Sequence, residues 1–231
     1  METELKLRFA SPDDQVSFMN SSWLHQLAMP DSRVETIMLS RYFDTRGKIL
    51  TMARTSLRIR QEGDASIATI KIGDQARAGC SSNGLHQRQE WSVDLEDQEW
   101  ASDPESGLSA NWFQKNAVSD GDPDDRLHDI LMMIDNQPLV EICQAGFVRT
   151  AFDVGFGDTL MELALDVGEL RAGELTDTIL ELELELKEGD VRDLMELGEE
   201  LKARFNLVPE PLSKYARCLA LLEQQQGIQD A

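Results

Sequence analysis

The 231-residue chain lacks the features that would assign it to several common classes of protein. No apolar run reaches the roughly 18 residues of a membrane-spanning helix, and the N-terminus lacks the basic-then-apolar order of a signal peptide. The few cysteines, Cys80, Cys143 and Cys218, show no CxxC spacing, so neither a disulfide framework nor a zinc site is indicated. We therefore expect a cytoplasmic protein that does not span a membrane.

Basic residues are also scarce. The sequence has 22 Lys and Arg against 43 Asp and Glu, a formal charge of -21, which argues against a general affinity for nucleic acid or anionic membranes. No Walker-type Gly-Lys-Ser/Thr loop is present, so the usual phosphate cradle at a helix N-terminus is not used. His25, His86 and His128 show no ligand spacing, and we expect none of them to be catalytic.

The order of the expected elements favours one antiparallel β domain over residues 1–226, followed by a short tail at 227–231. A helix is expected from Ser11 to Met29, because a hydroxyl N-cap and Pro12 begin it and Pro30 ends it. A polar, acidic excursion is expected at 97–125. Further helices are expected at 126–134, 190–205 and 213–226, and further strands at 38–44, 56–61, 65–73, 86–95, 139–144, 147–155, 159–167 and 178–187.

The N-terminal segment METELKLRF alternates charged and apolar residues with a period of two. As a strand it places four charged side chains on one face and Leu5, Leu7 and Phe9 among those on the other. The charged residues are Glu2, Glu4, Lys6 and Arg8. The second face of a strand in a water-soluble protein is normally only polar, so a second face made up of charged residues is unusual.

The segment LELELELK at 180–187 repeats this pattern with Glu181, Glu183 and Glu185 on one face. A helix would scatter its leucines around the whole circumference, so the strand is favoured. Taken alone, a surface strand with a solvated acidic face explains the pattern. Like charges on neighbouring sites nevertheless repel, by roughly 0.2–1 kcal/mol, and a divalent cation would remove that penalty.

Other expected strands add charges of both signs to their polar faces. Each strand alone could be amphipathic and solvated. Together, however, they predict a mainly β fold: an eight-stranded, closed antiparallel β-barrel with a charged lumen and helices packed outside. The charged positions on these strands are Arg58, Arg60, Lys71, Arg88, Glu90, Arg149, Glu162 and Asp166.

A lumen that contains both charge types suits one kind of chemistry. Arg and Lys can bind a chain of phosphates from several sides. Carboxylates repel phosphate, so glutamates in the same cavity imply a hard cation with oxygen ligands, Mg²⁺ or Mn²⁺. Such an ion can bridge phosphate oxygens and activate a water molecule.

These residues resemble a known family. Glu2-x-Glu4-x-Lys6 resembles the ExExK signature of the CYTH superfamily, the triphosphate tunnel metalloenzymes. LRIR, the Lys71 strand, GLHQRQEW, ALDVGEL, LELELEL and LSKYAR follow in the family's order over nearly the whole chain. GLHQR followed by Glu is similar to the bacterial inorganic triphosphatases. Members of that branch often carry a C-terminal helical CHAD domain, and these 231 residues show no counterpart of it.

The resemblance implies roles for individual residues. Phosphate would be bound by Lys6, Arg58, Arg60, Lys71, Arg88, Arg149 and Lys214. Glu4, with two of Glu181, Glu183 and Glu185, would hold a first metal ion. Glu2 would help to place a second ion or the attacking water, and the catalytic set would be Glu2, Glu4 and Lys214. Further lumen candidates are Arg8, Glu90, Glu162 and Asp166, of which Asp166 could instead orient a basic side chain.

The resemblance favours an inorganic triphosphatase, which converts tripolyphosphate and water to pyrophosphate and phosphate with Mg²⁺ or Mn²⁺, and we expect two such ions. One alternative on the same fold is an adenylate cyclase or a nucleoside or thiamine triphosphatase. These enzymes need a pocket for a base, and no aromatic-rich motif indicates one. An alternative of another class is a non-catalytic polyphosphate-binding module, but pure anion binding has no use for the glutamates.

Overall fold

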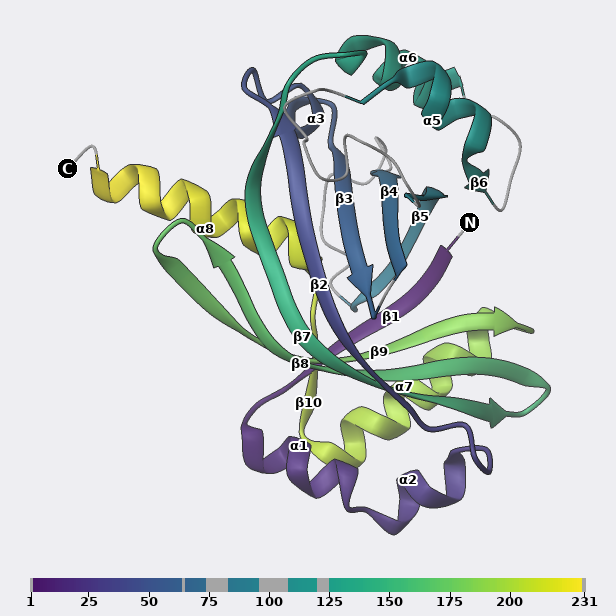
Figure 1. Cartoon of the computed structure of the whole chain (residues 1–231). Helices are drawn as coiled ribbons and strands as arrows, with labels where there is room; N and C mark the ends of the chain where they lie inside the picture. Colours follow the sequence, from purple (N-terminus) through teal and green to yellow (C-terminus); the bar gives the residue numbers. More distant parts are fainter. Residues whose placement is uncertain (1, 64, 74–82, 96–107, 120–124, 230–231) are drawn as a thin grey trace.

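The computed structural model describes residues 2–63, 65–73, 83–95, 108–119 and 125–229. Within them, eight antiparallel strands form a closed ring in the order β1-β9-β8-β7-β2-β3-β4-β5, in which β5 pairs with β1 again. Figure 1 shows this barrel. The strands are β1 (Glu2–Phe9), β2 (Val34–Thr45), β3 (Thr55–Glu62), β4 (Ala65–Ile72), β5 (Leu85–Asp94), β7 (Leu139–Phe156), β8 (Thr159–Ala172) and β9 (Leu175–Glu188). The predicted closed antiparallel barrel is confirmed.

Two short strands extend the ring. β10 (Leu207–Pro209) pairs with the C-terminal end of β1, and β6 (Val118–Ser119) pairs with β5. At the junction of β1 and β5, Lys6 N donates a 2.9 Å hydrogen bond to Gly84 O. Gly84 has φ +81°, and a Cβ there would lie 2.3 Å from Lys6 O. Only glycine therefore allows the two backbones to approach this closely.

The alternating strands bury both of their faces. Leu182 and Leu184 of β9 point outward into a core cluster with Leu5 and Leu7 of β1. Glu183, between the two leucines, points into the barrel and is also buried. Strands buried on both faces still alternate between apolar and charged residues here, because one face packs against an apolar core and the other faces a charged lumen.

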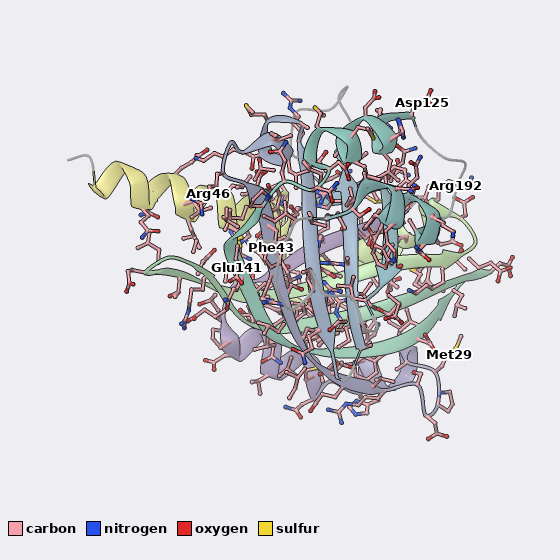
Figure 2. The ribbon with its side chains drawn as sticks, turned by 45° about the horizontal axis from the view of Figure 1, so that its top comes forward. Met29, Phe43, Arg46, Asp125, Glu141 and Arg192 are labelled. Atoms are coloured by element: carbon pink, nitrogen blue, oxygen red, sulfur yellow. The ribbon has the colours of Figure 1, made fainter. Side chains whose placement is uncertain are left out.

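Helices cover the outside and one end of the barrel (Figure 1). α1 (Pro12–Met19), α2 (Ser22–Leu27) and α7 (Val191–Phe205) cover the apolar face of β1, β8 and β9. α3 (Ile49–Met52), α5 (Ala110–Asn116) and α6 (Asp125–Ile134) pack on the outer residues of β3, β4 and β5. In Figure 2, Met29, after α2, and Asp125, the first residue of α6, lie at opposite ends of the molecule.

The last helix has a different position. α8 (Lys214–Gln229) begins beside lumen-facing residues of β2 and β7, including Tyr42 and Phe147. Its first residue, Lys214, is only 5% exposed. α8 therefore brings a side chain into the barrel, while the helices on the outer face stabilise the wall.

Two sequence-based expectations were wrong in detail. The single helix expected from Ser11 to Met29 is two helices, because α1 ends at Asn20 and the hydroxyl of Ser21 caps α2 by accepting from Leu24 N at 3.2 Å. The excursion at 97–125 is not only a polar loop, since it contains α5, in which Phe113 is fully buried. Its residues 97–107 and 120–124 lie outside the described part of the chain.

The structure also bears on the cysteines and on membrane insertion. Cys143 and Cys218 are free and buried in one core cluster, and Cys80 lies outside the described residues. Among the helices described, none combines the length and apolar character required to cross a bilayer.

Candidate active site

The barrel encloses a charged cavity of about 460 Å³. Every residue that the sequence analysis proposed for phosphate binding contributes to its wall: Lys6, Arg58, Arg60, Lys71, Arg88, Arg149 and Lys214. The carboxylates of Glu2, Glu4, Glu90, Glu183 and Glu185 also line it. Charged side chains from six strands and the start of α8 thus meet in one space.

The remaining candidates lie elsewhere. Glu181 and Asp166 are fully buried behind the cavity wall. Glu162 contacts Lys187 at 3.7 Å, outside the lining residues. Arg8 has a 55% exposed side chain that contacts Glu210 at 3.7 Å, and it does not line the cavity.

Strand register explains how the acidic and basic groups are distributed. Glu4 of β1 lies opposite Glu185 of β9, and Glu185 lies opposite Glu162 of β8, which gives a row of three carboxylates. In the next lumen row, Lys6 lies opposite Glu183. One row of the wall is therefore acidic, while the adjacent row is internally neutralised.

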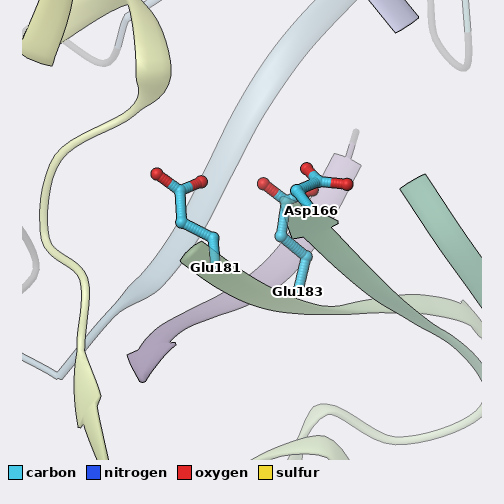
Figure 3. Close-up of side chains that lie close together, drawn as sticks. All are labelled: Asp166, Glu181 and Glu183. Atoms are coloured by element: carbon cyan, nitrogen blue, oxygen red, sulfur yellow. The ribbon is translucent and has the colours of Figure 1, made fainter. Parts of the chain in front are cut away.

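Figure 3 shows a cluster of three buried carboxylates, Asp166, Glu181 and Glu183. The ammonium of Lys214 contacts all three. Its Nζ lies 2.7 Å from Asp166, 2.7 Å from Glu181 and 2.8 Å from Glu183. Burial alone would lower the pKa of Lys214, but the three carboxylates outweigh it and raise this pKa well above its usual value. Lys214 therefore carries a permanent charge.

Arginines complete the neutralisation of this cluster. Arg149 donates two 2.7 Å hydrogen bonds to the carboxylate of Asp166 and also contacts Glu183. Arg217 of α8 binds Glu181 at 2.5 Å and Asp177 at 3.0 Å. Despite burial, which opposes ionisation, Lys214 and Arg149 hold the pKa of Asp166 below its usual range. All three carboxylates are thus already paired with cations.

The ion pairs that Asp166, Glu181 and Glu183 form with Lys214 and the arginines bear on where a divalent metal ion could bind. Oxygens of Asp166, Glu181 and Glu183 lie within 4.8 Å of one another, close enough to share an ion. Lys214 already takes the position between them, however, so an ion there would face an ammonium in direct contact. The Asp166–Glu181–Glu183 cluster is better suited to hold Lys214 than to hold a metal.

The row of Glu4, Glu185 and Glu162, with Glu2 beside it, fits a metal better. Burial raises the pKa of Glu185, and the negative charges of Glu2 and Glu162 raise it further. Each of these carboxylates has a cation nearby: Lys71 lies 2.7 Å from Glu2, Lys6 lies 3.5 Å from Glu4, and the 38% exposed Lys187 lies 3.1 Å from Glu185 and 3.7 Å from Glu162. Unlike Lys214 in its cluster, however, none of these lysines contacts all of the carboxylates at once. Carboxylate oxygens are the ligands that hard divalent ions require, so the donor set is suitable.

The opposite wall of the cavity has an excess of positive charge. Burial and the neighbouring cations Arg58 and Arg149 lower the pKa of Arg60 to about 10. Among the described residues, the buried Nε of Arg58 has no hydrogen-bond partner, although its NH2 lies 3.4 Å from the Thr69 hydroxyl. Buried donors are normally satisfied, so an anion in the cavity would complete this wall.

Sequence reasoning missed two groups beside the cavity. Arg217 was expected only as part of LSKYAR, yet its position three residues after Lys214 puts both on one helix face, where both bind Glu181. His86 was given no role, but it contacts Arg88. The other histidines lie at the surface: His25 is exposed and contacts Ser21 O, and His128 is exposed and contacts Gln114.

Comparison with protein families gives one match over almost the entire chain. The CYTH domain family matches residues 1–219. The chain belongs to this family. The resemblance inferred from ExExK and the later motifs is thereby confirmed, and the barrel with its charged interior is the CYTH domain.

One relative of this CYTH domain is the inorganic triphosphatase of Haemophilus influenzae, which is 29% identical over 185 residues. The match covers 80% of this chain but 46% of the relative, so the chain spans about half the length of that protein.

Solved structures share the fold at low sequence identity. A putative adenylyl cyclase from Hippeastrum, described as having a dominant triphosphatase activity, superposes with a TM-score of 0.63 at 19% identity, covering 97% of this chain and 96% of its own. A putative adenylate cyclase from Bacillus halodurans gives 0.53 at 17% identity, covering 92% and 96%. At this identity the likeness supports the fold alone.

Proposed function

We propose that this CYTH domain hydrolyses inorganic tripolyphosphate to pyrophosphate and phosphate with a divalent metal ion, Mg²⁺ or Mn²⁺. The observation that carries the proposal is the division of the cavity into a cationic wall and a carboxylate row. The related Haemophilus inorganic triphosphatase supports the same activity. A module that only bound polyphosphate would gain nothing from the acidic row.

The cationic wall would bind the substrate. Arg58, Arg60 and Arg88 present guanidinium groups to the cavity, and guanidinium–phosphate contacts are strong and can be bidentate. An anion bound beside them would give the Nε of Arg58 an acceptor and would offset the burial and the neighbouring cations that lower the pKa of Arg60. Tripolyphosphate carries several negative charges over a short length, which suits three such groups.

Two lysines would stabilise the charge that develops during cleavage. Glu183 accepts a 2.5 Å hydrogen bond from Lys6 and one of 2.8 Å from Lys214, so both ammonium groups lie at fixed positions at the cavity wall. Both have a raised pKa because nearby carboxylates outweigh the cost of burial, so neither loses its charge at neutral pH. Preorganised cations of this kind stabilise a leaving pyrophosphate without reorganisation.

The acidic row would hold the metal ion. Glu2, Glu4 and Glu185 provide lumen-facing carboxylates, and Glu162 lies next to Glu185 across the strand pair. When bound, a divalent ion supplies Lewis-acid polarisation of phosphate oxygens and lowers the pKa of a bound water. Glu181 and Glu183, in contrast, would act mainly by holding Lys214 and Lys6. The binding of two ions stays a prediction.

Nucleotides are expected to be poor substrates. Two aromatic side chains line the cavity, Tyr42 and Tyr215, and their rings pack against each other with centroids 5.4 Å apart. The hydroxyl of Tyr215 is bound to Thr51 at 3.0 Å. The face of each ring that meets the other is therefore unavailable to a base.

The direct test is phosphate release from tripolyphosphate, ATP, thiamine triphosphate and pyrophosphate, each with Mg²⁺, Mn²⁺ or a chelator. We expect the highest kcat/KM for tripolyphosphate and no turnover with the chelator. A higher kcat/KM for ATP, or formation of cyclic AMP, would move the assignment to a nucleotide enzyme. Binding of tripolyphosphate without hydrolysis under any metal condition would support the binding module instead.

A further inference from the structure

His86 contacts two segments that are distant in sequence and that both contribute to the cavity region: Arg88 on its own strand and Glu210 before α8. It is a residue of β5, it is paired with Glu4 of β1 in the strand register, and it is only 7% exposed. Its side chain does not line the cavity, but it contacts Arg88, which does. Because His86 and Arg88 are two residues apart on one strand, the ring lies on the lumen side of β5, next to the cavity.

The two hydrogen bonds of His86 define one tautomer. An arginine can only donate, so the 2.8 Å contact from Arg88 NH2 requires an unprotonated Nδ1. A carbonyl can only accept, so the 3.3 Å contact with Glu210 O requires a proton on Nε2. Burial and the charge of Arg88 lower the pKa of His86, which agrees with a neutral ring.

Each partner leads to a different charged group of the cavity. Arg88 belongs to the cationic wall. Glu210 is the first residue of the segment that connects β10 to α8, and α8 begins with Lys214. Glu210 N also donates a 2.9 Å hydrogen bond to Lys6 O. The backbone at Glu210 is thus held by β1 through Lys6 and by β5 through His86.

We propose that His86 is a positioning residue of the phosphate site, which fixes the guanidinium of Arg88 and anchors the segment that carries Lys214. This inference rests on the proposed function of the cavity. His86 does not line the cavity; it acts through the two residues that it contacts. Its loss should therefore affect substrate binding through Arg88 and turnover through Lys214.

Three substitutions separate the two contacts. In His86→Asn the amide oxygen takes the position of Nδ1, so it can accept from Arg88 but cannot reach Glu210 O. In His86→Gln the amide nitrogen takes the position of Nε2, so it can donate to Glu210 O while Arg88 loses its acceptor. His86→Leu removes both contacts. His128→Leu is the matched control, because His128 is exposed and bonded to Gln114.

The experiment measures kcat, KM and melting temperature for tripolyphosphate hydrolysis in each variant. We expect His86→Gln mainly to raise KM, by about tenfold, and His86→Asn mainly to lower kcat, with the control unchanged; tenfold corresponds to about 1.4 kcal/mol. His86→Leu should show both effects. If it does not fold, the split between Asn and Gln still decides the proposal.

The other outcomes are distinguishable. Wild-type kinetics in all three His86 variants, or equal losses in Asn and Gln that follow only their melting temperatures, would overturn the positioning role. If the wild-type protein does not hydrolyse tripolyphosphate, the proposed function fails instead. Calorimetric titration with tripolyphosphate then tests His86 separately: weaker binding to the Gln variant than to the Asn variant supports its role, and equal affinity overturns it.

Discussion

Lys214 Nζ lies 2.7 Å from the carboxylate of Asp166, which has no exposed surface. The ammonium arrives from α8 and the carboxylate from β8, so this contact joins the C-terminal helix to the barrel wall. It also places a permanent positive charge at the cavity.

Replacing Lys214 with Met should destabilise the protein and remove activity. The variant leaves buried carboxylates without their cation, and breaking a buried pair from one side typically costs about 3–5 kcal/mol. Denaturant unfolding measures this loss. Lys202→Met is the control, since Glu199, an exposed residue of α7, is the one ion-pair partner of Lys202 in the described part of the chain. A Lys214→Met variant as stable as the control would show that Asp166, Glu181 and Glu183 do not depend on this ammonium.

Glu185→Gln should stabilise the metal-free protein at neutral pH. Burial and neighbouring carboxylates raise the pKa of Glu185 in the folded state above its ordinary value of 4.5. The folded state thus binds more protons than the unfolded state between the two pKa values, so stability falls as pH rises through that window. The amide removes this fall. Melting temperatures of the wild type and of Glu185→Gln, measured from pH 4 to pH 8 with a chelator, test this prediction.

The same variant should lose most of the thermal stabilisation that Mg²⁺ or Mn²⁺ gives the wild-type protein, because a hard ion loses an anionic ligand. Glu200→Gln is the control on the surface of α7, where Glu200 contacts Arg204 at 3.9 Å. A metal-induced shift equal to that of the wild type would place the ion away from Glu185.

The strands and most lumen residues could be predicted from the sequence, because charged and apolar residues that alternate with a period of two indicate a β-strand with one charged and one apolar face. Glu181, Glu183 and Glu185 could not be told apart, since they are equivalent on one strand. Only tertiary partners separate them: Arg217 and Lys214 hold Glu181, whereas Lys187 alone pairs with Glu185 among the described residues. The buried helix α5 was missed because its segment is polar overall, and one residue, Phe113, carries much of its burial.

Lys187→Met should bind divalent metal more tightly than the wild type. Lys187 lies 3.1 Å from Glu185 and 3.7 Å from Glu162, where it competes with an ion for both carboxylates. Titration calorimetry with Mn²⁺ alone measures the affinity without turnover. Lys202→Met again serves as the control. Unchanged or weaker Mn²⁺ binding would mean that Lys187 does not occupy part of the metal site.

Arg58→Lys should weaken both tripolyphosphate binding and kcat/KM. Arg58 has a buried Nε without a partner and contacts Glu90 only at 3.9 Å, so its guanidinium is available to an anion. A charge-assisted hydrogen bond contributes roughly 1.5–3 kcal/mol, which corresponds to about a tenfold to hundredfold loss. The exposed Arg192, bound only to its neighbour Asp190 in the contacts described, provides the control Arg192→Lys. Unchanged kinetics would remove Arg58 from the phosphate site.

The central claim is that metal and phosphate chain bind together in one cavity. Calorimetric titration of tripolyphosphate into the wild-type protein, with and without Ca²⁺ in place of the active metal, tests it most directly. We expect Kd to fall at least tenfold with the metal, and the affinity for Ca²⁺ to rise by the same factor with tripolyphosphate, because coupling between two ligands is reciprocal. Identical Kd values with and without metal would contradict the account.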